Sequence, residues 1–135
     1  MAKIDAAQLW SLNYRLLSTV ITSVARDIGA LGVEPKELFL LAAIDEHFHP
    51  AALATALSMP KPTVTLMLKR LEAGGLVRRE IDATDLRRHR LSLTAAGRKT
   101  ATRGMAVLSA AYGERAALRR GEAIEALAAM LEKMS

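Results

Sequence analysis

The residues with the clearest binding chemistry are three arginines within four positions, Arg87, Arg88 and Arg90. A guanidinium group donates paired hydrogen bonds in a plane that matches phosphate oxygens. Earlier in the chain stand two threonines, Thr63 and Thr65. A threonine hydroxyl hydrogen-bonds a nucleic-acid base, and its methyl group contacts the methyl group of thymine. These residue types indicate binding to a nucleic acid rather than catalysis.

Positive charge is concentrated in residues 57–103. This segment holds eleven Lys and Arg and four acidic residues, a net charge of +7. The rest of the chain holds eight Lys and Arg and ten acidic residues, a net charge of −2. A basic segment on a near-neutral body is typical of a binding site for a polyanion, although a solvated basic face is the alternative explanation.

Groups that would support catalysis are sparse. The chain has no cysteine, which removes disulfides, thiolate metal sites and thiol redox sensing. Residues 45–49 include His47 and His49 beside acidic residues. Side chains two positions apart on a helix point away from each other, so no metal site is predicted there. Neither a nucleophile elbow nor a phosphate-binding glycine loop occurs, so we expect neither an enzyme nor a cofactor.

The sequence also bears on the compartment. No stretch approaches the roughly 18 uninterrupted apolar residues that a membrane span needs. No charged leader precedes an apolar run at the N-terminus, so a secretory signal is not expected. Together with the absence of cysteine, these features predict a cytoplasmic protein without a membrane partner.

Helices are predicted on both sides of the basic groups. Apolar residues recur at steps of three and four over residues 5–28, which predicts one long amphipathic helix. A second helix is expected from Pro35 to about Glu46, with Leu38, Leu41, Ala42 and Ile44 facing inward, and a short third one over 51–57. After the basic segment, a fifth helix begins at the N-cap Thr94 and a sixth follows Gly121.

Residues 61–93 predict a helix followed by a hairpin. The helix over 61–73 carries Val64, Leu68 and Leu71 on one face and ends at two glycines. Segments 76–81 and 90–93 are short enough to pair as strands, and the arginines stand in or beside the loop between them. The predicted fold class is mainly α with a small β-hairpin wing, a winged helix-turn-helix.

At this point the residues resemble the MarR family of bacterial transcription regulators. The most specific motif is D-x-x-D-x-R followed by a strand and L-T-x-x-G, given by Asp82, Asp85, Arg87, Leu93, Thr94 and Gly97. The motifs L-A-x-x-L, T-V-[ST] and L-E-x-x-G-L are given by Leu53, Ala54, Leu57, Thr63, Val64, Thr65, Leu71, Glu72, Gly75 and Leu76. They occur in order and at the family's spacing, and the resemblance covers essentially the whole chain.

Three positions depart from the family pattern. Pro60 stands where a serine often caps the recognition helix, so that cap is expected to be lost or shifted. Leu66 replaces a frequent polar residue on the side expected to face DNA. Leu86 replaces a common wing arginine, for which Arg88 compensates.

The resemblance implies that the 61–73 helix enters the major groove of double-stranded DNA, with the wing beside it. Arg87 is expected in the minor groove, Asp85 is expected to orient an arginine side chain, and Arg88 and Arg90 to contact the backbone. The candidate DNA-binding residues are Lys61, Pro62, Thr63, Thr65, Lys69, Arg70, Asp85, Arg87, Arg88 and Arg90. Ordinary helix capping is the alternative for the threonines, and a solvated turn is the alternative for the wing pair.

The resemblance further implies a homodimer and a small-molecule effector. Residues 1–135 form a single MarR-like domain, in which about 34–94 make the DNA-binding lobe and about 5–30 and 95–134 make a terminal-helix dimerisation region. The terminal helices are apolar enough to agree, although a core within one chain is the alternative. The candidate effector-binding residues are Trp10, Tyr14, Phe39 and Phe48, for which ordinary core packing is the alternative.

The predicted function is therefore sequence-specific, DNA-binding transcriptional regulation. We expect a homodimeric repressor on a pseudo-palindromic operator, with release by a small-molecule effector. A winged-helix protein-interaction module is the alternative, but such a module has no need of arginines clustered at the hairpin.

Overall fold

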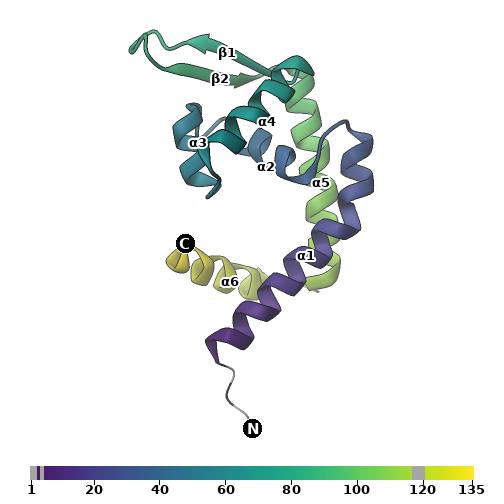
Figure 1. Cartoon of the computed structure of the whole chain (residues 1–135). Coiled ribbons are helices and arrows are strands. Elements are labelled where there is room, and N and C mark those ends of the chain that lie inside the picture. Colours follow the sequence, from purple (N-terminus) through teal and green to yellow (C-terminus); the bar gives the residue numbers. More distant parts are fainter. Residues whose placement is uncertain (1–2, 4, 117–120) are drawn as a thin grey trace. The chain divides into compact units, whose positions relative to one another are not determined.

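A computed structural model of the chain describes residues 3, 5–116 and 121–135. Helices and one hairpin follow each other in the order α1 (Ala6–Ala30), α2 (Pro35–Ala43), α3 (Pro50–Ala56), α4 (Lys61–Ala73), β1 (Val77–Ile81), β2 (His89–Leu93), α5 (Ala95–Ala116) and α6 (Gly121–Met134) (Figure 1). The predicted fold class, mainly helical with a small antiparallel hairpin, is confirmed.

The chain divides into two compact units. Val24–Val107 form the larger unit, and Met1–Ser23 with Leu108–Ser135 form the smaller one. The divisions fall inside α1 and α5. The larger unit therefore contains all of α2, α3, α4 and the hairpin, and it extends beyond the lobe predicted over about 34–94.

The larger unit has an aliphatic core. Its fully buried side chains come from successive elements and include Ile28, Leu38, Leu40, Leu41, Ile44, Leu53, Val64, Leu68 and Leu91. The helix α2 was expected to turn Ala42 inward, but Ala42 is exposed and Leu40 is buried instead. Buried positions on α2 span more than one face because the helix is covered on several sides.

The segment between α2 and α3 was predicted wrongly in part. The second helix ends at Ala43 rather than near Glu46, and α3 begins at Pro50. Proline at the first helical position has a preset φ and lacks only an N–H that would find no helical partner. The preceding residue, His49, is extended, at φ −112° and ψ 142°, as a residue before proline prefers.

The hairpin is buried at its base and becomes exposed towards its loop. The strands pair so that Val77 lies opposite Leu93, Arg79 opposite Leu91 and Ile81 opposite His89. Val77 and Leu91 are buried, whereas Ile81 at the far end is 63% exposed. Near the middle, Arg79 donates to both carboxylate oxygens of Glu72 on α4, at 3.0 and 3.2 Å.

The base of the hairpin is tied to α4 and α5. Thr94 donates its hydroxyl to the carbonyl of Gly75 at 2.6 Å and accepts the N–H of Gly97 at 3.0 Å, which confirms its predicted N-cap role. The Thr94 N–H also donates to the carbonyl of Leu76 at 3.1 Å. A Cβ atom at Gly97 would overlap that carbonyl oxygen, so only glycine permits this close approach of α5.

The smaller unit leaves many large apolar side chains exposed. On α1 these are Leu9, Trp10, Leu12, Tyr14 and Leu17, and on α6 they are Ile124, Met130, Leu131 and Met134. Only towards its C-terminal end does α1 bury its apolar positions, at Val20, Val24 and Ile28.

Among the described residues, no single helix has both the length and the apolar composition to cross a membrane. The bent pair of α1 and α2 reaches the required values only when the two helices are taken together. Leu38, Leu40 and Leu41 of α2 are buried inside the larger unit.

Candidate nucleic-acid interface

The helix α4 has one buried and one exposed face. Val64, Leu68 and Leu71 are buried, as predicted from their spacing. The remaining face exposes Lys61, Pro62, Thr63, Thr65, Leu66, Lys69 and Arg70. Leu66 is 71% exposed and, at about 100° per residue, lies opposite the buried stripe. An exposed leucine at the centre of this face contributes little to the core and is available to a ligand.

The start of α4 follows a tight turn. Its N-cap is Pro60, which makes no side-chain cap hydrogen bond, as expected from the departure at this position. Before it, Ser58 ends α3 with a positive φ of 51°. The N–H groups of Ser58 and Met59 bond to the carbonyls of Thr55 and Ala54, the pattern of a Schellman motif. The turn thereby sets the direction in which α4 leaves α3.

The end of α4 is closed by a second motif of the same kind. The Leu76 N–H donates to the carbonyl of Leu71, and the Gly75 N–H donates to that of Glu72. Gly75 has φ +73°, a conformation that glycine adopts without strain. The strand β1 therefore starts at a defined angle to α4.

Two of the candidate residues on α4 already have partners within the chain. The Arg70 guanidinium lies 3.6 Å from Glu34 and 3.6 Å from Glu37, whose side chain is only 3% exposed. Arg70 was expected to contact phosphates, but the structure places it as the counter-ion of a buried carboxylate. The Thr65 hydroxyl donates to the carbonyl of Lys61 at 3.0 Å, which leaves its methyl group and oxygen lone pairs for a ligand.

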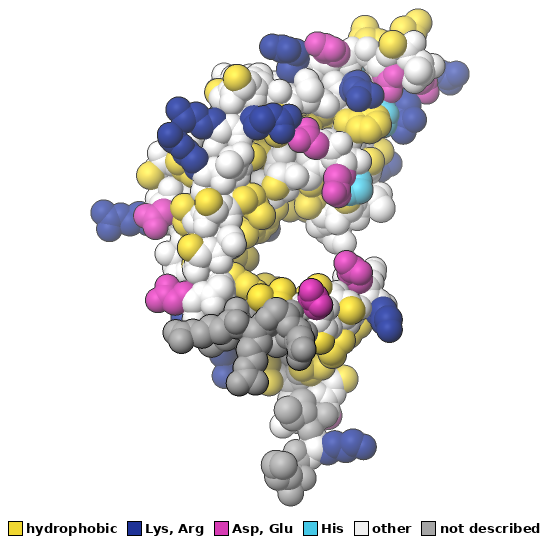
Figure 2. All heavy atoms as spheres, turned by 180° about the vertical axis from the view of Figure 1, so that it is seen from behind, with side chains coloured by type: hydrophobic (Ala, Val, Ile, Leu, Met, Phe, Trp, Pro, Cys, Tyr) yellow, Lys and Arg dark blue, Asp and Glu magenta, His cyan; other side chains and the backbone are white. Residues whose placement is uncertain are grey.

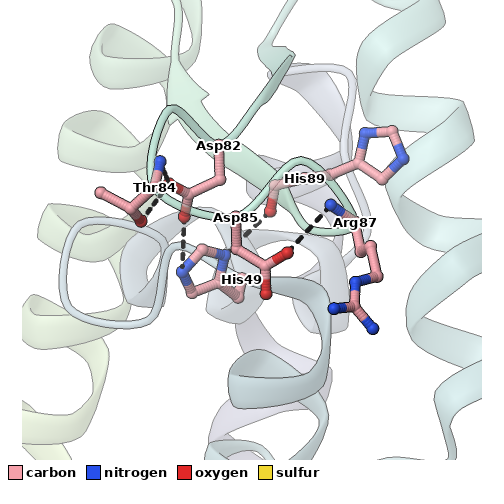
Figure 3. Close-up of polar contacts among 6 residues, drawn as sticks. All are labelled: His49, Asp82, Thr84, Asp85, Arg87 and His89. Carbon is pink, nitrogen blue, oxygen red and sulfur yellow. Dashed lines mark hydrogen bonds and ion pairs between the residues drawn. The ribbon is translucent and has the colours of Figure 1, made fainter.

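The loop of the wing is built from its own hydrogen bonds (Figure 3). The Asp82 carboxylate accepts the N–H of Thr84 at 2.9 Å and its hydroxyl at 2.7 Å. Hydrogen bonds from the Thr84 hydroxyl and backbone hold the pKa of Asp82 below its usual value, and the nearby His49 and Arg90 act in the same direction. The loop closes where the Asp82 N–H donates to the carbonyl of Arg88 at 2.9 Å.

The expected role of Asp85 needs correction. Its carboxylate accepts the backbone N–H of Arg87 at 3.0 Å, and the Arg87 guanidinium points away from it in Figure 3. The Asp85 carbonyl also accepts the Arg88 N–H at 3.0 Å. An aspartate at the first position of a tight turn favours such bonds to the backbone. Asp85 shapes the loop, and the side chains of Arg87 and Arg88 extend into solvent.

The arginine nearest the base of the wing lies over an aromatic ring. The Arg90 guanidinium carbon is 4.2 Å from the centroid of Phe48, and the Leu91 N–H donates to the Phe48 carbonyl at 2.7 Å. Arg90 was expected at the DNA backbone and Phe48 at an effector site, but the two side chains contact each other. This contact fastens β2 to the segment before α3.

A further contact at this point had no signal in the sequence. His49 Nε2 lies 3.2 Å from the Asp82 carboxylate, and its Nδ1 lies 3.0 Å from the carbonyl of His89 (Figure 3). The side chains of His49 and Asp82 are 12% and 9% exposed. These residues are far apart in the chain, and only the hairpin register brings them together. Across the described residues, no group of three or more His, Asp or Glu could hold a metal ion.

Two other effector candidates, Trp10 and Tyr14, belong to the smaller unit. Their rings stack with centroids 5.2 Å apart. They line a hollow of about 580 Å³ with Leu9, Leu17, Leu131 and Met134. Phe39 lies in the larger unit and is half-buried on α2. Each unit thus holds two of the four predicted residues.

The surface of the larger unit carries many charged side chains. In Figure 2, Lys and Arg side chains are spread over this unit, and hydrophobic side chains stand at the outer end of the hairpin. Two exposed residues there are Ile81 and Leu86, the latter 80% exposed. A surface of cations with a few apolar groups fits a DNA groove, where phosphates and thymine methyl groups lie side by side.

Comparison with known proteins shows a family that part of the chain is similar to. Residues 31–88, from the end of α1 through the wing loop, match the model of the MarR family. This segment, less than half of the chain, is therefore similar to the MarR family. No curated protein matches the chain by sequence. The matched segment includes both helices of the helix-turn-helix and the arginines of the loop.

Solved structures of MarR proteins share the fold. A MarR-family transcriptional regulator from Silicibacter pomeroyi is 26% identical, with a TM-score of 0.78 over 91% of this chain and 84% of that one. CouR, a transcriptional repressor solved bound to a 23-mer DNA duplex, is 24% identical, with a TM-score of 0.75 over 98% and 99%. A mutant of MarR from E. coli, solved in complex with operator DNA, is 20% identical, with a TM-score of 0.76 over 93% and 92%.

Proposed function

We propose that this chain is a transcriptional regulator of the MarR type that binds double-stranded DNA through α4 and the wing. The observation that carries the proposal is the exposed face of α4, followed by a loop that presents arginines and is held by its own hydrogen bonds. Proteins of similar fold have been solved in complex with DNA. The charge of residues 57–103, +7, supports a polyanionic partner.

In this proposal α4 lies in the major groove. Thr63 and Leu66 face base edges, where the threonine hydroxyl bonds a base and the leucine contacts thymine methyl groups. Lys61 and Lys69 lie along the same side of α4 and bind phosphates there. Arg70 contributes less than a free arginine, because its guanidinium is shared with Glu34 and Glu37.

The wing lies over the adjacent minor groove. Arg87 and Arg88 are exposed side chains on a loop held by Asp82 and Asp85, so little ordering remains to be done on binding. A narrow, A·T-rich minor groove concentrates negative potential and attracts an arginine side chain. We assign Arg87 to that groove.

A homodimer completes the proposal. Trp10, on α1, and Met130 and Met134, on α6, are 65%, 58% and 66% exposed, more apolar surface than a monomer usually leaves in water. A second copy covers these side chains and gives a two-fold pair of α4 helices. Half-sites of a pseudo-palindromic operator then lie one turn apart, about 34 Å.

The regulatory part of the proposal is repression relieved by a small molecule. The hollow beside Trp10 and Tyr14 has apolar walls and a volume of about 580 Å³, within the size of small-molecule sites. An aromatic or anionic effector that binds there more tightly when the dimer is in a conformation unable to bind DNA would shift the population towards that conformation.

The test begins with selection of bound fragments from random or genomic DNA. Arg87→Ala is then expected to weaken binding to the selected duplex by about tenfold or more, the cost of one base-edge or groove contact. Arg26→Ala, which removes another exposed arginine, on α1, serves as the control with the same charge change. Affinity of the wild type should fall steeply as salt rises, because phosphate contacts release counter-ions.

Two results would overturn the proposal. One is the absence of any enriched duplex, which would favour a protein-interaction module instead. The other is an enriched duplex whose binding is insensitive to both salt and Arg87→Ala.

A further inference from the structure

His49 lies between two hydrogen-bond acceptors. Its Nε2 faces the carboxylate of Asp82 at 3.2 Å, and its Nδ1 faces the backbone carbonyl of His89 at 3.0 Å. The side chain is 12% exposed, so water has little access to either contact. His49 is also the N-cap residue of α3, the first helix of the helix-turn-helix.

The protonation state of His49 follows from these partners. A neutral imidazole has one N–H group, whereas the imidazolium has two. A backbone carbonyl only accepts, and an ionised carboxylate only accepts. Asp82 stays ionised because Thr84 donates two hydrogen bonds to it, which hold its pKa below the usual value. Both contacts of His49 are therefore made only by the imidazolium.

The two partners belong to opposite strands of the wing. Asp82 directly follows β1, and His89 begins β2. Through one ring, the N-cap residue of α3 contacts both the end of β1 and the start of β2 (Figure 3). Loss of one ring proton would remove one of the two donors and leave an acceptor without its partner.

We propose that His49, as an imidazolium, is a positioning residue that holds the wing in its DNA-binding orientation, so that DNA affinity falls as pH rises. The inference rests on the proposed DNA-binding function and goes beyond it by naming a proton as a regulator of the same site. The sign follows from linkage, since a state that requires the extra proton is populated at lower pH and lost at higher pH.

Other groups around His49 limit the effect without reversing it. The bond from Leu91 to Phe48 and the stacking of Arg90 on Phe48 do not depend on this proton, so the base of β2 stays attached. The titratable and charged groups of the wing are Arg78, Arg79, Glu80, Asp82, Asp85, Arg87, Arg88, His89 and Arg90. The segment before α3 adds Asp45, Glu46 and His47, and the last two lie 3.9 Å apart.

Asp82→Asn gives the sharpest test, because with this variant a neutral His49 ring can make both hydrogen bonds. An asparagine amide donates as well as accepts, so its NH2 group can donate to Nε2 of a neutral imidazole while Nδ1–H still donates to His89. The variant is expected to bind DNA with the same affinity at pH about 6 and about 8.5, since no extra proton is required. The wild type should lose about threefold to tenfold in affinity over the same range.

Two further variants complete the comparison. His49→Gln cannot make both bonds at either pH and should bind weakly with a flat pH profile. His89→Gln keeps the backbone carbonyl, and the His89 ring points away from His49 in Figure 3, so this variant should keep the wild-type slope. A purely structural role for His49 would lower affinity in His49→Gln but leave the same slope in the wild type and Asp82→Asn.

The protonation of the His49 ring can be measured in the absence of DNA. Nitrogen NMR of the free protein at pH about 6 should show protons on both ring nitrogens of His49, and the backbone amide signals of residues 82–89 should shift as it titrates. A singly protonated ring at that pH, or equal slopes in the wild type and Asp82→Asn, would overturn the inference. Failure to bind any DNA would instead overturn the proposed function, because the NMR measurement does not require DNA.

Discussion

At the residue scale, the wing loop depends on a few carboxylate hydrogen bonds. Asp82 and Asp85 look alike in the sequence motif, but Asp82 bonds to Thr84 and His49, whereas Asp85 bonds to the backbone of Arg87. Both contribute to the shape of the loop, and neither is paired with the guanidinium group of Arg87 or Arg88. The exposed arginines are therefore left free to meet an anionic partner.

Thr84→Ala tests this account of Asp82. Because the Thr84 hydroxyl is the largest cause of the lowered pKa, its removal should raise the pKa of Asp82 towards the ordinary value of about 3.9. A carboxylate with a depressed pKa stabilises the fold above that value and stops doing so as pH falls through the folded-state pKa. The unfolded chain begins to take up this proton at the same pH in both proteins, so the loss of stability that Asp82 causes in acid should be smaller in the variant and should end at a higher pH.

Carbon NMR of the carboxyl groups and urea unfolding between pH about 3 and about 6 measure the two quantities. Thr55→Ala is the matched control, because the Thr55 hydroxyl donates only to the carbonyl of Ala51 within α3, at 3.2 Å. An Asp82 titration unchanged by Thr84→Ala would contradict the assignment.

Substitution of two leucines on α4 distinguishes a contribution to stability from a contribution to DNA recognition. Leu68 is fully buried and Leu66 is 71% exposed. Leu68→Ala should cost about 2–5 kcal/mol of unfolding free energy, whereas Leu66→Ala should change it by less than about 0.5 kcal/mol. Of the two, only Leu66→Ala should leave a stable protein with altered DNA preference.

Replacing single thymines by uracil in the selected duplex removes their methyl groups and identifies the base that Leu66 contacts. Replacement of that thymine should lower the affinity of the wild type but not the affinity of Leu66→Ala. Equal losses in both proteins would exclude the contact.

At the scale of elements, a residue with positive φ sets the direction of the chain on each side of α4. Gly75 adopts its positive φ without strain, but Ser58 has a Cβ atom at φ 51°. For a residue with a side chain this conformation costs about 1–2 kcal/mol. The strain is retained because the bonds of Ser58 and Met59 to α3 leave no other path for the chain.

Ser58→Gly is therefore expected to raise the unfolding free energy by about 0.5–1 kcal/mol, after allowance for the greater entropy of glycine in the unfolded chain. Gly75→Ala, at the corresponding position of α4, should have the opposite sign. Urea denaturation of both variants measures the effect, and a loss of stability in Ser58→Gly would show that its hydroxyl has a role that outweighs the strain.

Many of the helix bounds were predictable from the sequence. The spacing of Val64, Leu68 and Leu71 and the pair of glycines after them predicted α4 with the bounds that it has. The end of α2 was placed too late, because residues 44–46 continue an apolar and charged pattern that a helix also shows. The contact of His49 with Asp82 could not be predicted, since it arises only when β1 and β2 pair and pack beside α3.

At the scale of the whole molecule, the two units differ in how well they bury their apolar residues. The larger unit encloses an aliphatic core, and the smaller one exposes leucines, methionines, Trp10 and Tyr14. In the proposed dimer, a second copy would bury the apolar side chains that the smaller unit exposes. For this part of the molecule the sequence predicted apolar helices, and the resemblance implied a second copy as their partner, which stays a prediction.

Leu131→Asp, which places a charge on the exposed apolar face of α6, should shift the protein towards monomer in sedimentation velocity measurements. Affinity for the full operator should fall with it, since one lobe then binds one half-site. Ala25→Asp, an exposed position of α1 in the larger unit, is the control. A wild type that sediments as a monomer at micromolar concentration would contradict the proposed dimer.

The close approach at Gly97 has a consequence for the entropy of binding. The base of the hairpin is immobilised before any ligand arrives, by the Thr94 hydrogen bonds and by the contact of α5 with the Leu76 carbonyl. Conformational freedom in the wing is confined to the loop between β1 and β2, which is short and already bonded to itself. An association that uses this wing therefore surrenders little backbone entropy, and a larger share of the contact energy at Arg87 and Arg88 appears as affinity.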